Sequence, residues 1–454
     1  MQTEMAPPVP SRAPATPGGT GLPPAAISTL EAQTMRKVSK RLVPFLLIAY
    51  LVSVIDRTNI GFAGMQMSQD VGLSQSMFGL AGGIFFVSYF LCEVPSNLAL
   101  ERFGARRWLS RIMISWGVVA GASALVIGPK TFFTMRLILG AAEAGFLPGA
   151  IYYLTHWFPS AYRSRVMASF ILSVPAAGLL GSPISGALLN LGGVLGLRGW
   201  QWLFLIEALP AILLGVFALF WLTDSPKQAE WLSVEQRNWL IARLADDASQ
   251  RHAPSKVSTW KVLSDWRVLM LTLVCGSTVT VSTVLGFWQP LIIRSFGVSY
   301  FHAGLLTALP YGAAALAMIL WGRLSDRLGE RIWFNVVPMS LAVVGMVGTL
   351  FVSSLTGTVI LFVLVMVGTY ACKGPFWALA TESVSATAAA AGIAQINALG
   401  SLPGFFASYL IGAIRESTGS YPLAILPIAA FCAMGVLTVL IIGRLQSQAR
   451  WFQS

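Results

Sequence analysis

The sequence predicts an all-α membrane protein of about twelve transmembrane helices, arranged as two pseudo-symmetric bundles of six. The first observation is composition: 56% of the 454 residues are hydrophobic, 11% are charged, and the mean hydropathy is +0.71. Soluble domains carry roughly 25% charged residues. The second is the length of the uncharged runs, since Val268–Leu285 contains no Asp, Glu, Lys or Arg. Runs of about 20 apolar residues fit a hydrocarbon core ~30 Å thick.

Apolar windows predict twelve spans, and the longest polar stretch divides them into two sets of six. The spans are expected near 42–66, 77–100, 107–127, 131–157, 164–189, 200–223, 266–290, 302–322, 332–353, 357–380, 388–413 and 421–443. The corresponding regions are a disordered tail (1–35), a first bundle (36–223), a central loop (224–265), a second bundle (266–446) and a short tail (447–454). The first tail is rich in Pro, Ala and Gly and has no apolar core, which is typical of disorder.

The central loop contains an amphipathic segment, Ala229–Leu244. Its Trp and Leu side chains favour a helix that lies on the cytoplasmic surface of the membrane. The large apolar side chains of this segment are Trp231, Leu232, Trp239 and Leu240.

The distribution of basic residues is the third observation. The net charge is +12, and on this topology 23 of the 30 Lys and Arg lie on one side of the membrane. That asymmetry is the positive-inside pattern of a multi-pass protein of the inner (plasma) membrane with both termini cytoplasmic. The basic charge therefore reports orientation, and we expect no nucleic-acid partner. The four cysteines have no metal-ligand spacing, so we expect neither a metal nor a cofactor.

An internal repeat supports the division into halves. The segment Glu101–Arg106 recurs as Asp326–Arg331, an offset of 225 residues. The same offset carries Leu42, where the first span begins, to Arg267, where the seventh begins. Two related six-helix halves are typical of secondary transporters, which bind their substrate between the halves near the midplane.

Several segments resemble a known family. Gly322–Arg331 resembles the signature loop of the major facilitator superfamily, and the earlier copy matches it with Asn97 in place of the leading glycine. Four further segments resemble the anion:cation symporter branch of that superfamily, and the similarity extends over residues 36–450. These segments are Ile55–Gly61, Trp200–Glu207, Gly374–Leu379 and Ala391–Asn397. The resemblance implies proton-coupled uptake, by alternating access, of a small organic anion such as tartrate, an aromatic acid or a sugar acid.

Ionisable residues inside the spans are candidates for function because they are costly to bury there. Asp56 and Arg57 lie ~20 Å into the first span. They fit a fixed cation for a substrate carboxylate beside an acid able to take a proton, and the alternative is a structural ion pair with neighbouring helices. Glu143 lies in the middle of the fourth span. Arg136, two turns earlier, could attract anions or pair with Asp56.

The resemblance implies roles for some of these residues. Proton coupling is implied for Asp56 and Glu143, and carboxylate binding for Arg57. Tyr89 and Asn397 match polar substrate contacts of the branch.

Lys373 is the cation of the second half that lies inside a span, next to Gly374-Pro375, with Trp377 one turn further on. We hypothesise that Lys373 and Arg57 hold the two charges of a diacid from opposite halves. The alternative is an internal pair between Lys373 and Glu382. For Glu93 and Glu207, a role in tying helices together is favoured.

The two signature loops supply charged side chains to the cytoplasmic face, where ion pairs between the halves would stabilise an outward-open state. These candidate gate residues are Glu101, Arg102, Arg106, Asp326, Arg327 and Arg331. The sequence contains no phosphate-binding loop, HExxH pair or nucleophile elbow, so we expect a transporter rather than an enzyme. The alternative function is an exporter or antiporter of a drug or metabolite with the same fold. We expect a monomer in the lipid bilayer.

Overall fold

The computed structural model describes residues 24–250, 265–383 and 389–448, and it contains helices and no strand within those ranges. The helices of the first half are α1 (Pro24–Asp70), α2 (Gln75–Phe103), α3 (Ala105–Ala122), α4 (Pro129–Glu143), α5 (Phe146–Thr155), α6 (Ser160–Leu188) and α7 (Gly199–Trp221). A crossing helix follows, α8 (Val234–Gln250). The second half contains α10 (Trp266–Arg294), α11 (Tyr300–Leu328), α12 (Ile332–Gly348), α13 (Leu355–Ala371), α14 (Lys373–Ser383), α15 (Ala389–Thr418) and α16 (Tyr421–Ser447). Short 3-10 turns are η1 (Ser123–Leu125), η2 (Leu189–Leu191), η3 (Val194–Gly196) and η4 (Pro226–Gln228).

The number of spans agrees with the prediction. Eleven helical segments of the described chain are long and apolar enough to cross a membrane, and the shorter apolar helix α12 occupies the place of the ninth span. Two of the spans are broken near their middle, because α4 stops at Glu143 before α5, and α13 stops at Ala371 before α14. Gly145 turns the chain at the first break with a φ of 84°. At the second, Pro375 lacks the N–H that a continuous helix would use.

The internal repeat is confirmed. An offset of 225 residues carries α2 onto α11 from the first residue to the last. It also carries Gly104 onto Gly329, and both glycines end their helices with a positive φ, of 85° and 65°. The two halves are therefore copies of one six-helix unit.

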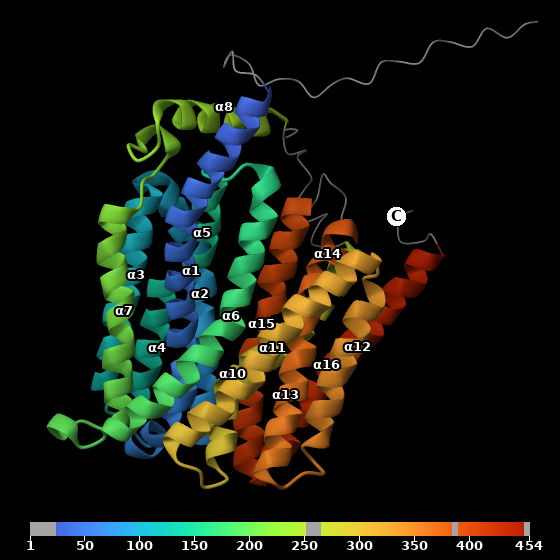
Figure 1. The fold of residues 1–454 in the computed structure, drawn as a ribbon. Helices are drawn as coiled ribbons and strands as arrows, with labels where there is room; N and C mark the ends of the chain where they lie inside the picture. Colours follow the sequence, from blue (N-terminus) through green and yellow to red (C-terminus); the bar gives the residue numbers. More distant parts are fainter. Residues whose placement is uncertain (1–23, 251–264, 384–388, 449–454) are drawn as a thin grey trace, which may run out of the picture.

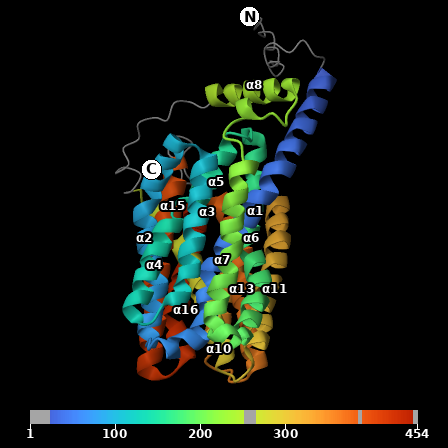
Figure 2. The ribbon, with the colours of Figure 1, turned by 90° about the vertical axis from the view of Figure 1, so that its left-hand side faces the viewer.

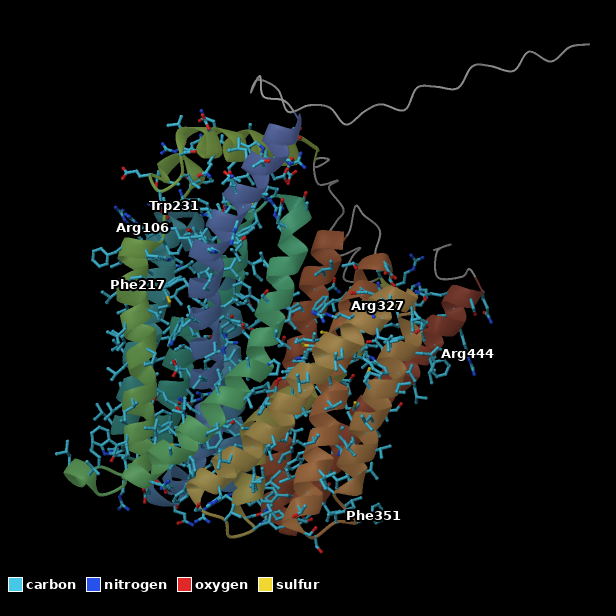
Figure 3. The ribbon with its side chains drawn as sticks, viewed as in Figure 1. Arg106, Phe217, Trp231, Arg327, Phe351 and Arg444 are labelled. Atoms are coloured by element: carbon cyan, nitrogen blue, oxygen red, sulfur yellow. The ribbon has the colours of Figure 1, made fainter. Side chains whose placement is uncertain are left out.

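The halves meet through α1 and α10, α2 and α15, and α6 and α11. Both described ends of the chain lie at one face of the bundle, which we call the terminal face, and the opposite one is the distal face (Figure 1). Figure 3 marks the terminal face with Arg106, Arg327 and Arg444 and the distal face with Phe351.

Glycines pack the two halves tightly at the distal face. A Cβ atom on Gly79 would lie 2.3 Å from the backbone oxygen of Ser408, and one on Gly412 would lie 2.2 Å from that of Gln75. A Cβ atom on Gly186 would lie 2.6 Å from the backbone oxygen of Tyr300. Toward the terminal face the halves diverge (Figure 1). The two halves are thus packed closely at the distal face, and their backbones lie further apart toward the terminal face.

The chain enters its first span later than α1 begins. Because α1 starts at Pro24, residues 24–35 are helical, so the expectation of disorder is wrong for them. The remainder of the expected tail (1–23), residues 251–264 of the central loop and residues 449–454 lie outside the described residues.

The apolar side chains of the central loop's amphipathic segment pack on the first half of the protein. Helix α8 crosses the terminal face of the first half and packs against α1 (Figure 2). Leu232, Trp239 and Leu240 are buried in the core of this half. The Trp231 ring stacks on that of Trp157, with 5.4 Å between centroids. The extension of α1 beyond the first span provides part of this protein surface, and the position of α8 relative to the membrane stays a prediction.

Candidate functional site

A cavity of about 240 Å³ lies between the halves, at the level where the predicted in-span charges cluster. The residues of the first half that line it are Tyr50, Val54, Arg57, Thr58, Gly82, Phe85, Phe86, Arg136, Val174 and Gly178. Those of the second half are Val279, Ser282, Thr283, Gly286, Phe287, Tyr311, Tyr370, Ser401 and Ser408. Aromatic rings and hydroxyl groups therefore surround two guanidinium groups.

Arg57 and Glu143 form a buried ion pair in the cavity wall. Arg57 Nε donates to Glu143 Oε1 at 2.7 Å, and the two side chains are 20% and 1% exposed. The Ser53 hydroxyl donates to the same carboxylate oxygen at 2.6 Å. The ring centroid of Tyr89 lies 4.9 Å from the Arg57 guanidinium carbon. The structure thus joins three predicted site residues in one cluster, although Glu143 and Tyr89 do not themselves line the cavity.

Arg136 lines the cavity without a carboxylate partner in the described chain. Its Nε donates to the backbone oxygen of Ala81 at 3.3 Å, and its guanidinium carbon lies 4.8 Å from the centroid of the Phe85 ring. Only 4% of the residue is exposed. The alternative in which Arg136 pairs with Asp56 is wrong, because Asp56 faces a different helix.

Asp56 points away from the cavity. Its carboxylate accepts a hydrogen bond from the Trp116 indole of α3 at 2.8 Å, and it is not among the lining residues. Of these two adjacent residues, Arg57 lines the cavity and Asp56 does not. Adjacent residues point about 100° apart on a helix, and only the Arg57 side of α1 faces the other half.

The candidate residues Lys373 and Trp377 of the second half do not line the cavity. Lys373 Nζ lies 4.2 Å from the centroid of the Tyr370 ring, and Tyr370 is a lining residue. The alternative pair of Lys373 with Glu382 is wrong, because Glu382 accepts from Arg331 at 3.2 Å. Trp377 is half-buried against the Phe376 ring.

Asn397 is exposed, one helical turn nearer the terminal face than Ser401. Ser401 is a cavity-lining residue. Asn397 is therefore one turn from a lining residue but does not itself line the cavity.

The charged residues of the signature loops pair only within their own half in the described structure. Arg331 bonds Asp326 at 2.9 Å as well as Glu382, and the backbone N–H of Arg106 donates to Asp224 at 2.8 Å. The remaining candidates are exposed: Glu101, Arg102 and Arg327. Within the described ranges, no ion pair joins the halves at the terminal face, in keeping with their separation there.

Comparison with known proteins decides the family. The model of the Major Facilitator Superfamily matches residues 46–408. The chain belongs to this superfamily.

Individual relatives of this facilitator are transporters. A protein of Agrobacterium vitis named "Putative tartrate transporter" is 45% identical over 420 residues, which cover 92% of this chain and 93% of that protein. The "Putative metabolite transport protein NicT" of Pseudomonas putida is 41% identical over 388 residues, which cover 85% and 88%. The facilitator is thus a secondary transporter of small organic substrates and not an enzyme.

Solved structures share the fold of this facilitator. A bacterial homolog of the human lysosomal transporter Spinster, in an inward-facing and occupied conformation, superposes with a TM-score of 0.70 at 19% identity, covering 88% of this chain and 96% of that one. A D-xylose-proton symporter superposes with a TM-score of 0.67 at 18% identity, covering 90% and 96%.

Sequence reasoning missed the polar residues that the second half of the facilitator contributes to the cavity. The repeat could have found two of them, because the 225-residue offset carries Arg57 onto Ser282 and Phe86 onto Tyr311. Neutral residues in a span carry no energetic signal comparable with a buried charge, so the remaining hydroxyl groups could not be singled out.

Proposed function

We propose that the facilitator takes up a small organic anion, a carboxylate such as tartrate, an aromatic acid or a sugar acid, together with protons. The observation that carries this proposal is Arg136, a buried cation in the cavity wall without a carboxylate partner in the described chain. Arg57 is neutralised by Glu143. The cavity therefore keeps one uncompensated positive charge, and an unpaired buried charge favours an ion of opposite sign.

The Arg57–Glu143 pair supports coupling to protons. Glu143 holds the guanidinium of Arg57 through the same oxygen that Ser53 contacts. A proton on Glu143 would remove the charge that competes for Arg57, so Arg57 and Arg136 could then bind the anion together. Loss of that proton would restore the ion pair and expel the anion. Binding of proton and anion would favour each other through this competition.

The distribution of basic residues supports an inner-membrane location with the terminal face in the cytoplasm. The structure would then be an inward-open state of an alternating-access cycle, with the distal face closed toward the periplasm. In the opposite state, ion pairs between the signature loops of the two halves would close the cytoplasmic face. We propose that one monomer carries out the cycle, since the cavity is formed by the two halves of a single chain.

Lys373 supports a preference for diacids. Its ammonium group lies 4.2 Å from the centroid of the Tyr370 ring, which lines the cavity and belongs to the other half than Arg57 and Arg136. A rotation of the Tyr370 ring would bring a second positive charge to the cavity. Lys373→Ala should then weaken uptake of dicarboxylates more than that of monocarboxylates, and equal losses for both classes would refute this preference.

The test of the proposed function is uptake by the purified protein in liposomes. Labelled tartrate and a set of mono- and dicarboxylates are supplied with and without an inward proton gradient. We expect concentrative uptake of at least one carboxylate with the gradient, and its loss in Arg136→Gln. Uptake that ignores the proton gradient would refute symport, and uptake of neutral sugars in preference to carboxylates would refute the anion class.

A second candidate is export of a drug or metabolite. A protein of Acinetobacter baumannii named "Quinolone resistance transporter" is 37% identical over 420 residues, 92% of this chain and 97% of that one. The three Phe side chains of the cavity, Phe85, Phe86 and Phe287, suit an aromatic cargo. Expression in a drug-sensitive host distinguishes the two functions, because an exporter raises drug tolerance and an importer of organic anions does not.

A further inference from the structure

Behind the cavity wall, four helices of the first half enclose a second acidic group. Asp56 of α1 and Glu207 of α7 are 3% and 6% exposed, and they lie close enough for their charges to interact. Trp116 of α3 donates to Asp56 at 2.8 Å, and Ser185 of α6 donates to Glu207 at 2.6 Å. The Asn59 side chain also hydrogen-bonds Glu207. Neither carboxyl lines the cavity.

These two carboxyls differ from Glu143 in their lack of a cationic partner in the described chain. Glu143 is paired with Arg57, but in the described chain no cation pairs with Asp56 or Glu207. One oxygen of each, Asp56 Oδ1 and Glu207 Oε2, is buried without a hydrogen-bond partner. Two neighbouring carboxylates that are both ionised, buried and without a cation are unstable, and such pairs hold a shared proton.

The groups that face Asp56 and Glu207 include no cation of the described chain. A bound proton is therefore the positive charge that can compensate the two carboxylates. Helix α1 presents Asp56 and Asn59 to α7, α6 presents Ser185, and α3 presents the Trp116 indole to Asp56. Across α1, the charge of Glu143 also repels that of Asp56. The surroundings thus supply neutral donors and negative charge, and no basic side chain of the described residues faces the pair.

Glu207 is also connected, through Ser185, to the contact between α6 and α11 at the distal face. We call this contact the seam, and it must open in an alternating-access cycle. Ser185 precedes Gly186, whose Cα packs against the backbone of Tyr300 and Gly304 in the other half. An added Cβ on Gly304 would lie 2.5 Å from the backbone oxygen of Ser182, one turn before Ser185. Opening the distal face separates α6 from α11 at this point. Water that enters the seam would then lie one residue from Ser185, the donor of Glu207.

We infer that Glu207 is a proton-binding residue of the transport cycle, which takes a proton from the distal side and shares it with Asp56. When the seam is open, a hydronium ion gives its proton to the Glu207 carboxylate and leaves water. When the seam closes, the proton stays with the pair, and when the terminal face opens it passes to water, which becomes hydronium and leaves the carboxylate. This inference rests on the proposed proton symport, and it adds a residue for which the sequence analysis favoured a structural role.

The test measures the number of protons moved with each anion by the intact protein in liposomes. The probe is labelled tartrate, or whichever carboxylate the uptake assay identifies, with a pH-sensitive dye inside the vesicles. Glu207→Gln keeps an acceptor for Ser185 and Asn59 but cannot release a proton. We expect it to move one proton fewer per anion and to lose at least tenfold of proton-driven accumulation, while exchange of labelled for unlabelled anion persists. Glu93→Gln, a change in a half-buried carboxyl of α2 outside the pair, should keep the wild-type ratio.

An unchanged ratio in Glu207→Gln would overturn the inference, and so would an equal loss in Glu93→Gln. A wild-type protein that moves anions without protons would instead overturn the proposed symport itself, so the two failures are distinguishable. If Glu207→Gln does not fold, Ser185→Ala is the variant that tests the inference. Loss of a donor disfavours the ionised carboxylate, so half-maximal uptake should move to higher pH in that variant. An unchanged pH profile would overturn the inference.

Discussion

Replacing Arg136 by Gln should remove anion binding without destabilising the unliganded protein. In the structure this guanidinium has one backbone acceptor, Ala81, and no carboxylate partner in the described chain. Its loss therefore leaves no buried anion uncompensated. A hydrogen bond to a charged group contributes about 1.5–3 kcal/mol, and 1.4 kcal/mol corresponds to a factor of about ten in Kd. We expect anion binding to weaken by about 10- to 150-fold.

The assay is thermal unfolding of purified protein with and without the anion. At a concentration 100 times Kd, a ligand stabilises the native state by about 2.7 kcal/mol. If Kd rises about 100-fold, the same concentration stabilises by only about 0.4 kcal/mol. The ligand-induced rise in melting temperature should therefore nearly vanish in Arg136→Gln, while the melting temperature without ligand stays at or above that of the wild type.

Arg57→Gln is the matched control, because it removes the partner of a buried carboxylate. Breaking a buried pair from one side costs about 3–5 kcal/mol when the remaining charge stays ionised. That variant should melt earlier without ligand, and acid should restore part of the loss by protonating Glu143. If Arg136→Gln melts as early as Arg57→Gln, or binds anions with wild-type affinity, the assignment of Arg136 as the unpaired cation of the site is refuted.

Three further predictions concern other parts of the molecule. Glu143→Gln should abolish proton-driven accumulation while sparing counterflow exchange in liposomes, and a variant that still concentrates substrate would contradict the coupling role. Gly412→Ala places a Cβ atom 2.2 Å from the Gln75 backbone oxygen, so it should open the distal face and increase labelling of cysteines introduced there. Gly322→Ala, with no atom within 4 Å of the added Cβ, should leave labelling unchanged. Trp239→Ala removes a core side chain of α8 and should cost about 3–5 kcal/mol of unfolding free energy, whereas a loss below 1 kcal/mol in chemical denaturation would mean that α8 does not pack as described.

Much of the fold could be predicted because the bilayer constrains it. Span number follows from apolar length, and the repeat follows from the recurrence of Glu101–Arg106 at a fixed offset. What could not be predicted is how far each helix is rotated about its axis. Asp56 and Arg57 are adjacent, yet one contacts Trp116 and the other lines the cavity. That difference depends on which helix packs on which side of α1, and no local pattern encodes it.

The partners of the site residues were equally beyond the sequence. The in-span charges that line or approach the cavity were singled out, since the cost of burial marks a charge far from the ends of a span. Their pairing depends on tertiary contacts, as with Arg57 and Glu143, which are 86 residues apart. The same holds for Glu382, which bonds Arg331 rather than the nearer Lys373.

The two halves share one backbone plan, but the ionisable groups around the cavity are distributed very unequally between them. Arg57, Arg136, Glu143, Asp56 and Glu207 all belong to the first copy, and position 57 of that copy corresponds to a serine, Ser282, in the second. Under the proposed function, the proton-binding carboxyls and both cavity arginines would belong to one half, while the other would present mainly hydroxyl groups and rings, with Lys373 beside Tyr370. On that proposal, a change of cargo could evolve through substitutions in the second copy, while the proton-binding residues of the first copy stay unchanged.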